Sequence, residues 1–106
     1  MAKSMYEINM DFNNAKNQAA NLEAVAKNIE NMINNDFEPC MRGISANWKG
    51  DNAENYVKKG NRLKADIEKT AKNLRKAAST IRTIAKNIYD AEKAAYEIAQ
   101  ARKYNG

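Results

Sequence analysis

Ten residues near the middle of the chain, RGISANWKGD at positions 42–51, decide how it folds. They hold two glycines, an asparagine and an aspartate, and they interrupt two long stretches almost free of such turn-forming residues. Asp51 is a good helix N-cap, and Glu54, three residues later, can complete a capping box with it. The stretch therefore predicts a turn at about 46–50, with one helix before it and another after it.

Upstream of this turn, apolar or small residues recur at steps of three or four, the spacing of one helix face. This pattern predicts a first helix over about 4–45. Pro39 lacks an N–H and crowds the preceding turn, so we expect the helix to kink or restart there. The stripe consists of Met5, Ile8, Phe12, Ala15, Ala19, Leu22, Ala26, Ile29 and Ile33, followed by Phe37, Met41, Ile44 and Trp48.

Downstream, the same spacing runs without a proline and predicts a second helix over about 51–103. A short connection forces two long helices to lie antiparallel with their apolar stripes facing each other. The second helix then extends beyond the first at its C-terminal end. The second stripe consists of Ala53, Tyr56, Gly60, Leu63, Ile67, Thr70, Leu74, Ala77, Ile81, Ile84, Ile88, Ala91, Ala95 and Ile98.

The predicted fold is all-α, a single domain over residues 1–106 formed by an antiparallel two-helix hairpin with heptad-like seams. Two helices alone leave such a seam partly exposed to solvent. Apolar residues outside the stripes indicate a second contact surface. We therefore expect two hairpins to pair into a four-helix bundle. The alternative is an isolated hairpin that tolerates these residues in water. They are Met10, Val25, Met32, Val57, Tyr89 and Tyr96.

The composition argues against catalysis. The 106 residues include no histidine and one cysteine, Cys40, so they provide no Ser–His or Cys–His pair, no imidazole ligand and no intramolecular disulfide. The acidic pairs Asp36/Glu38 and Asp66/Glu68 are two residues apart and point to different helix faces. We expect no enzymatic activity, no cofactor and no metal. Cys40 is expected to be a buried or partly buried filler, and a dimer-linking disulfide is the alternative.

The sequence shows no obvious targeting segment. Its longest apolar runs, such as Ala24-Val25-Ala26, have three residues, whereas a membrane span needs about 20. The first thirteen residues lack the apolar core of a cleavable signal peptide. The chain would therefore stay in the cytoplasm unless another export route applies.

The sharpest motif is Trp48-Lys49-Gly50, in the predicted turn. Tryptophan offers a large rigid apolar surface with one N–H donor, suited to closing the end of a bundle. Gly50 permits the backbone geometry of a tight approach to the second helix. A lone Trp-x-Gly occurs often by chance, but here it lies at mid-chain, at the bend of a predicted hairpin of roughly a hundred residues.

In these features the whole chain resembles the WXG family of hundred-residue proteins exported by type VII (ESX-type) secretion systems, the early-secreted-antigen-target-like proteins. The resemblance covers the full chain in architecture and the turn in motif. It implies a hairpin that forms a homodimer or heterodimer and leaves a Gram-positive or mycobacterial cell folded. The protein would be cytoplasmic before export and extracellular afterwards, without a signal peptide. Implied partners are itself or a sister hairpin protein, a helical toxin targeting domain and the secretion ATPase.

The resemblance also implies an export signal near the C-terminus. Mycobacterial members carry Tyr followed four residues later by an acid, and this chain departs from that pattern because Lys93 follows Tyr89 and Gln100 follows Tyr96. A looser pattern of other Gram-positive members has a hydrophobic residue, an acid four later, and hydrophobic residues three and four further on. A plain amphipathic helix produces this spacing readily, which is the alternative. The matching residues are Ile88, Glu92, Ala95 and Ala99.

The net charge of +5 is unevenly spread, because residues 1–53 carry a net −2 and residues 54–106 a net +7. Eight basic residues at predicted outward positions of the second helix form what we term the basic stripe. It is a solvated face, a docking site for an acidic partner or a nucleic-acid contact. Nucleic acid is the least expected, since no aromatics interleave the stripe. The stripe consists of Lys58, Arg62, Lys69, Lys72, Arg75, Lys76, Arg82 and Lys86.

Taken together, the sequence predicts a small non-enzymatic protein exported by a type VII secretion system, or partnering one of its substrates. It would act through helical-bundle dimerisation. The alternative function is a basic helical protein that binds nucleic acid in an architectural role.

Overall fold

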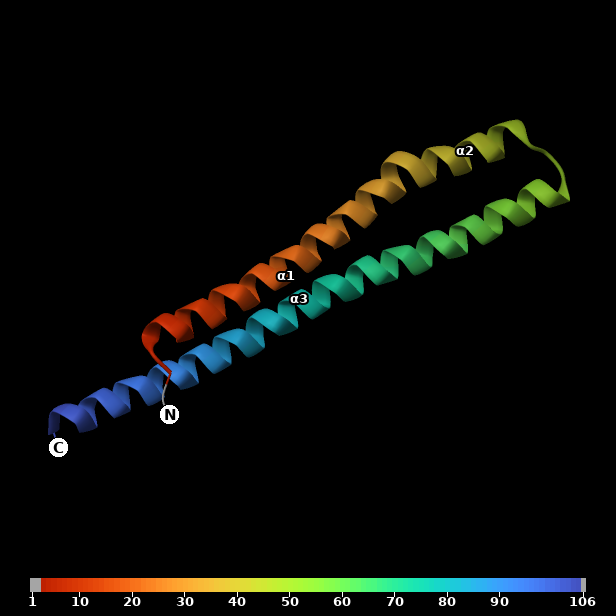
Figure 1. The fold of residues 1–106 in the computed structure, drawn as a ribbon. Helices are drawn as coiled ribbons and strands as arrows, with labels where there is room; N and C mark the ends of the chain where they lie inside the picture. Colours follow the sequence, from red (N-terminus) through yellow and green to blue (C-terminus); the bar gives the residue numbers. More distant parts are fainter. Residues whose placement is uncertain (1–2, 106) are drawn as a thin grey trace. The chain divides into compact units, whose positions relative to one another are not determined.

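The computed structural model describes residues 3–105, so residues 1–2 and 106 of the predicted domain lie outside the described part. The described chain is helical throughout except for its first residues and the turn, and it contains no strand. Its elements are α1 (Met5–Met32), the π-helix η1 (Ile33–Phe37), α2 (Glu38–Asn47) and α3 (Asp51–Asn105) (Figure 1). The prediction of an all-α helical hairpin is confirmed.

The chain divides into two compact units. The first consists of Met1–Asn21 with Ala77–Gly106, and the second of Leu22–Lys76. Within each unit, a segment from the first half of the chain lies beside a segment of α3 that runs in the opposite direction (Figure 1). Both units therefore have the same helix-on-helix construction.

In the first unit, the start of α1 is fixed by a cap and by an ion pair. The Glu7 N–H donates to Ser4 Oγ at 3.2 Å, so Ser4 caps the helix, as serine commonly does. The Lys3 Nζ lies 2.8 Å from an Asp11 carboxylate oxygen and 3.2 Å from one of Glu92 in α3. α3 continues beyond Glu92 to Asn105, and its last turns extend past the start of α1 (Figure 1).

In the second unit, Pro39 explains the change of helix type between α1 and α2. Pro39 has no N–H and occupies one of the first positions of α2, where a missing donor is tolerated. The turn before it widens, and the Glu38 N–H donates to the Ile33 carbonyl five residues back. The expected kink or restart is thus a π-helical turn followed by a new helix.

The contact seam of α1 is as predicted, because every stripe residue from Met5 to Ile33 is buried or half-buried. The predicted seam of α3 is wrong at nine of its fourteen positions. Gly60, Ile67, Leu74 and Ile81 do contribute as half-buried residues, and Ala53 is buried. However, the stripe residues Tyr56, Leu63, Thr70, Ala77, Ile84, Ile88, Ala91, Ala95 and Ile98 are exposed.

The rest of the α3 seam is supplied by a column of small residues, each one position after an exposed stripe residue and so about 100° further around the helix. Ala71 belongs to the second unit and Ala78 and Ala85 to the first, and all three are buried. Val57 and Tyr89, expected to lie outside the seam, are half-buried in it. Alanine lets two helix backbones approach closely. The seam of α3 is therefore mixed: its alanines are buried, half-buried larger residues such as Ile67 and Leu74 lie beside them, and Leu63 and Ile84 remain exposed.

Candidate interaction surfaces

The turn that carries the Trp-Lys-Gly motif is short and depends on one glycine. The Trp48 N–H donates to the Ile44 carbonyl at 2.9 Å and ends α2, and the Glu54 N–H donates to the Gly50 carbonyl at 3.2 Å and begins α3. Gly50 has a φ of +112°, a conformation that favours glycine. Asp51 is the first helical residue, so Gly50 occupies the N-cap position that the sequence assigned to Asp51. The carboxylates of Asp51 and Glu54 lie in the first helical turn, where the helix dipole favours negative charge.

The Trp48 ring lies on the surface rather than in a core. Its side chain is 54% exposed and meets the Tyr56 ring edge-on, with centroids 5.8 Å apart and planes at 77°. A hollow beside it is lined by Ser45, Trp48, Ala53 and Val57, among others. The motif thus presents an aromatic pair to solvent next to a partly apolar depression.

Large apolar side chains of α3 are exposed in each of the two units. In the second unit Tyr56 and Leu63, seven residues apart, are 59% and 51% exposed. In the first unit Ile84 and Ile98, fourteen residues apart, are 52% and 55% exposed. Positions separated by multiples of seven lie on one side of a helix, so within each unit these residues share a face.

The predicted export signal lies on one face of α3 in the first unit. By helical geometry Ile88, Glu92, Ala95 and Ala99 share that face, and all except Glu92 are exposed. Glu92 is half-buried, and its carboxylate accepts a hydrogen bond from Lys3. The hydrogen bonds from Lys3 to Asp11 and Glu92 raise the pKa of the Lys3 ammonium.

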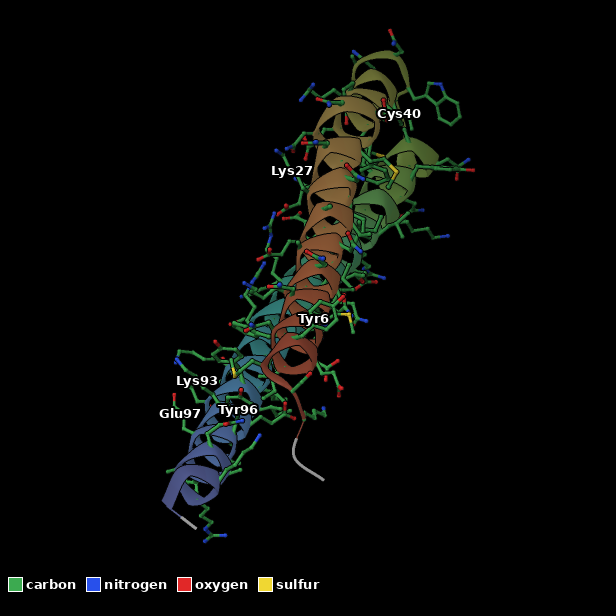
Figure 2. The ribbon with its side chains drawn as sticks, turned by 60° about the vertical axis from the view of Figure 1, so that its left-hand side comes forward. Tyr6, Lys27, Cys40, Lys93, Tyr96 and Glu97 are labelled. Carbon is green, nitrogen blue, oxygen red and sulfur yellow. The ribbon has the colours of Figure 1, made fainter. Side chains whose placement is uncertain are left out.

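Figure 2 shows three neighbours of this signal, Lys93, Tyr96 and Glu97, on the same segment of α3. Tyr96 is half-buried, and Lys93 and Glu97 are exposed. The last turns of α3 therefore expose charged side chains beside the apolar residues of the predicted signal.

The basic stripe separates into paired and unpaired residues. Arg75 forms an ion pair with Glu30, which raises the pKa of the guanidinium, and Lys86 forms one with Asp90 at 2.8 Å, which raises the pKa of its ammonium. Arg82 is half-buried, so the expectation that the whole stripe points outward is wrong at this position. The other five, which we term the basic ridge, are exposed: Lys58, Arg62, Lys69, Lys72 and Lys76.

Besides Arg75–Glu30, the described residues include other unpredicted ion pairs that join α3 to the first half of the chain. Lys64 pairs with Glu38 of α2. The hydrogen bond between them is the main reason that the pKa of the Glu38 carboxyl is lowered and the pKa of the Lys64 ammonium is raised. Lys3 pairs with Glu92. Lys64 lies seven residues before Ala71, in the same column of α3 that forms the seam. A charged residue at a seam position was therefore the sequence feature that could have indicated this ion pair.

Two other expectations concern reactive groups and membranes. Cys40 is exposed on α2, so the expectation of a buried or partly buried filler is wrong (Figure 2). Within residues 3–105 no cluster of three or more His, Cys, Asp or Glu side chains is arranged to hold a metal ion. In the same part of the chain, no helix combines the length and apolar character that spanning a bilayer requires.

Comparison with known proteins gives one match. The family model WXG100, described as "Proteins of 100 residues with WXG", matches residues 7–93. This range contains the Trp48-Lys49-Gly50 turn and most of the helical residues on either side of it. No curated protein matches the chain. No solved structure matches it either.

Proposed function

The chain belongs to the WXG100 family of small helical proteins associated with type VII secretion, and from this premise we propose that it is a non-enzymatic substrate, or the partner of a substrate, of such a system. Members of this family leave the cell without a signal peptide and typically pair as helical hairpins. In our proposal the chain pairs through the exposed apolar face of α3. Its partner is a second copy or a sister hairpin protein.

The observation that supports pairing is the exposure of large side chains on α3 while alanines form the seam. Tyr56, Leu63, Ile84 and Ile98 each leave about half of their surface in water. Burying the rest of such a side chain contributes roughly 1 kcal/mol, so four of them on each of two chains yield on the order of 8 kcal/mol. This lies within the range of about 4–15 kcal/mol that association costs, and further contacts from the same face add to it.

The proposal also gives a role to the turn. The exposed Trp48–Tyr56 pair beside its hollow provides the kind of aromatic anchor that dominates protein interfaces. Trp48 would contact the partner rather than the interior of its own hairpin. Gly50 supports this role indirectly, because it holds the turn that displays Trp48.

The export signal is proposed to be the face formed by Ile88, Glu92, Ala95 and Ala99. Ile88 and Glu92 line a hollow together with Ile8 of α1, and Ala95 and Ala99 follow on the next turns of α3. A secretion ATPase or a helical toxin targeting domain would approach this face from solvent. The exposed Ile88 supplies an apolar contact and Glu92 a charge. Recognition would compete with Lys3 for the Glu92 carboxylate.

The pairing is tested by the mass of the purified chain in solution, measured by light scattering. We expect twice the chain mass of 11.9 kDa, or a one-to-one complex with a sister hairpin encoded beside it. Replacing both Leu63 and Ile84 by Glu places charges in the apolar face and should give the single-chain mass. The matched control changes Ala65 and Thr83 to Glu, which adds the same charge at exposed positions on other sides of α3.

A thermal melt separates loss of pairing from loss of folding. Because a dimer is stabilised by mass action, the melting temperature of the wild-type chain, or of its complex, should rise with protein concentration. The control variant should behave in the same way, and the Leu63→Glu/Ile84→Glu variant should lose this dependence. A wild-type chain that stays monomeric alone and with its sister protein would refute the pairing proposal.

A further inference from the structure

We propose that the basic ridge of α3 is a docking surface for an anionic lipid bilayer. The ridge consists of Lys58, Arg62, Lys69, Lys72 and Lys76, which all belong to the second unit. The inference concerns a surface that hairpin pairing does not use. It stands independently of the proposed secretion function.

The five residues form a straight line of positive charge. At 100° per residue they fall within an arc of about 80° around the helix axis, and at 1.5 Å per residue they extend along about 27 Å. Between Lys58 and Lys76 the only other residue on this line is Ala65, which is small and exposed. No acidic side chain interrupts it.

The charge of the ridge is not neutralised by the chain itself. In the described part of the chain no carboxylate forms an ion pair with any of the five residues. Glu30 and Glu38, two acidic residues of this unit, bind Arg75 and Lys64 instead. The ridge therefore retains its charge for an external partner.

The ridge also lies on its own side of α3. Tyr56 and Leu63, the exposed apolar residues of the same unit, lie about 150° around the helix from the centre of the ridge. A second hairpin packed on that apolar face leaves the ridge in solvent. Pairing and docking through the ridge are thus compatible.

The shape of the ridge favours a flat partner over a duplex. A straight helix laid on a plane touches it along a line, so all five cations can approach the headgroup phosphates of a bilayer together. The phosphate strands of B-form DNA wind around the axis and are separated by grooves about 12 and 6 Å wide, so a straight line meets them only at intervals. The ridge also contains no aromatic side chain on which single-stranded bases could stack.

The composition of the ridge favours a bilayer over an acidic protein helix. Four of the five residues are lysines, which act as hydrated point charges rather than as the bidentate donors that select individual carboxylates. Exposed salt bridges between two proteins contribute little each. Near an anionic bilayer, by contrast, each basic residue raises the affinity about fivefold, and the contributions of several residues accumulate.

The test measures binding of the full chain to sedimented lipid vesicles. We expect binding to vesicles made of equal parts phosphatidylglycerol and phosphatidylcholine, no binding to pure phosphatidylcholine, and loss of binding at roughly 0.5 M salt, where screening is strong. Changing Lys69, Lys72 and Lys76 to Glu should weaken binding by at least about a hundredfold, the loss expected from removing three cations alone. Circular dichroism checks that the variant remains helical, as expected for exposed positions.

The matched control changes Lys27, Lys49 and Lys103 to Glu, which alters the net charge equally at exposed positions outside the ridge. This variant should bind within a few-fold of the wild type. An equal loss in both variants would show that only net charge matters and would overturn the proposal. Absence of wild-type binding, binding to the neutral vesicles, or tighter ridge-dependent binding to single-stranded DNA, duplex DNA or poly-glutamate would also overturn it.

Discussion

At the scale of the residue, the turn between α2 and α3 depends on Gly50. Its φ of +112° is a conformation that side-chain-bearing residues rarely adopt, although an added Cβ would meet no atom within 4 Å. The requirement is therefore for backbone freedom and not for space. Gly43 differs in this respect, because it lies within α2 with an ordinary backbone and equally open surroundings.

We predict that Gly50→Ala and Gly43→Ala change stability in opposite directions. Gly50→Ala should lower the free energy of unfolding by about 1–3 kcal/mol, the cost of a strained backbone position. Gly43→Ala should raise it by roughly 0.5–1 kcal/mol, because alanine is the better helix former. Urea denaturation measures both. A Gly50→Ala chain as stable as the wild type would show that the turn has no need of glycine.

A second residue-level prediction concerns the response to acid. The hydrogen bond from Lys64 lowers the pKa of Glu38 below its ordinary 4.5. A lowered pKa in the folded state means that the stabilisation is fully present above pH 4.5 and is lost as the pH falls through the lowered pKa. Glu38→Gln should therefore reduce the loss of stability on acidification, measured as the urea midpoint from neutral pH to about pH 3.

Glu97→Gln is the matched control, because it removes one exposed glutamate that lies outside this pair. Its acid response should follow the wild type. The raised pKa of Lys64 acts at the other extreme, since its stabilisation is present below its ordinary 10.5 and is lost as the pH rises through the raised value. If Glu38→Gln and Glu97→Gln lose stability equally as the pH falls from neutral to about 3, the Lys64–Glu38 ion pair does not contribute to stability.

At the scale of the element, the sequence allowed α1 to be predicted almost fully and α3 only in part. In α1 the apolar stripe and the contact seam coincide, so the three- and four-residue spacing was sufficient. In α3 a column through Leu63 and Ile84 competes with a column through Ala71 and Ala78. Spacing alone cannot choose between neighbouring columns, and ranking by side-chain size selects the wrong one, because closely packed helices need small residues.

The candidate surfaces show a similar division. The turn motif and the charge asymmetry could be read from residue order, since both are local properties of the chain. The pairs Lys64–Glu38 and Lys3–Glu92 could not, because they depend on which turn of one helix faces which turn of the other. The exposure of Trp48 was also missed, since a large aromatic at a bend is equally compatible with closing a core.

The alanine seam leads to a prediction about α3. Ala71→Leu would insert a larger side chain at a position that is 1% exposed, and overpacking of this kind costs typically 1–3 kcal/mol. Ala65→Leu makes the same chemical change at an exposed position of the same unit and should leave stability nearly unchanged. Thermal unfolding of the two variants gives the comparison. Equal melting temperatures would show that α3 does not pack tightly through its alanines.

At the scale of the whole molecule, the basic ridge lies apart from the apolar face of α3, whereas the proposed export signal lies on the same side of α3 as Ile84 and Ile98. The alanines hold the arms of each unit together, the exposed apolar face of α3 is proposed to bind a second hairpin, and the basic ridge is proposed to meet a bilayer. The proposed export signal lies on the last turns of α3. Membership of the WXG100 family associates the chain with type VII secretion. The pairing face and the export signal are proposed on that basis, and the basic ridge is proposed independently of it.

The most direct test of this central claim is the amount of the chain in the culture medium of its native host, measured by immunoblot against a cytoplasmic marker. We predict that the wild-type chain is found in the medium and that deletion of the secretion ATPase keeps it in the cells. The Ile88→Ser/Glu92→Ser variant should be retained in the same way, whereas Lys93→Ser/Glu97→Ser, on other faces of the same turns, should be exported. Equal amounts in the medium with and without the ATPase would contradict the account.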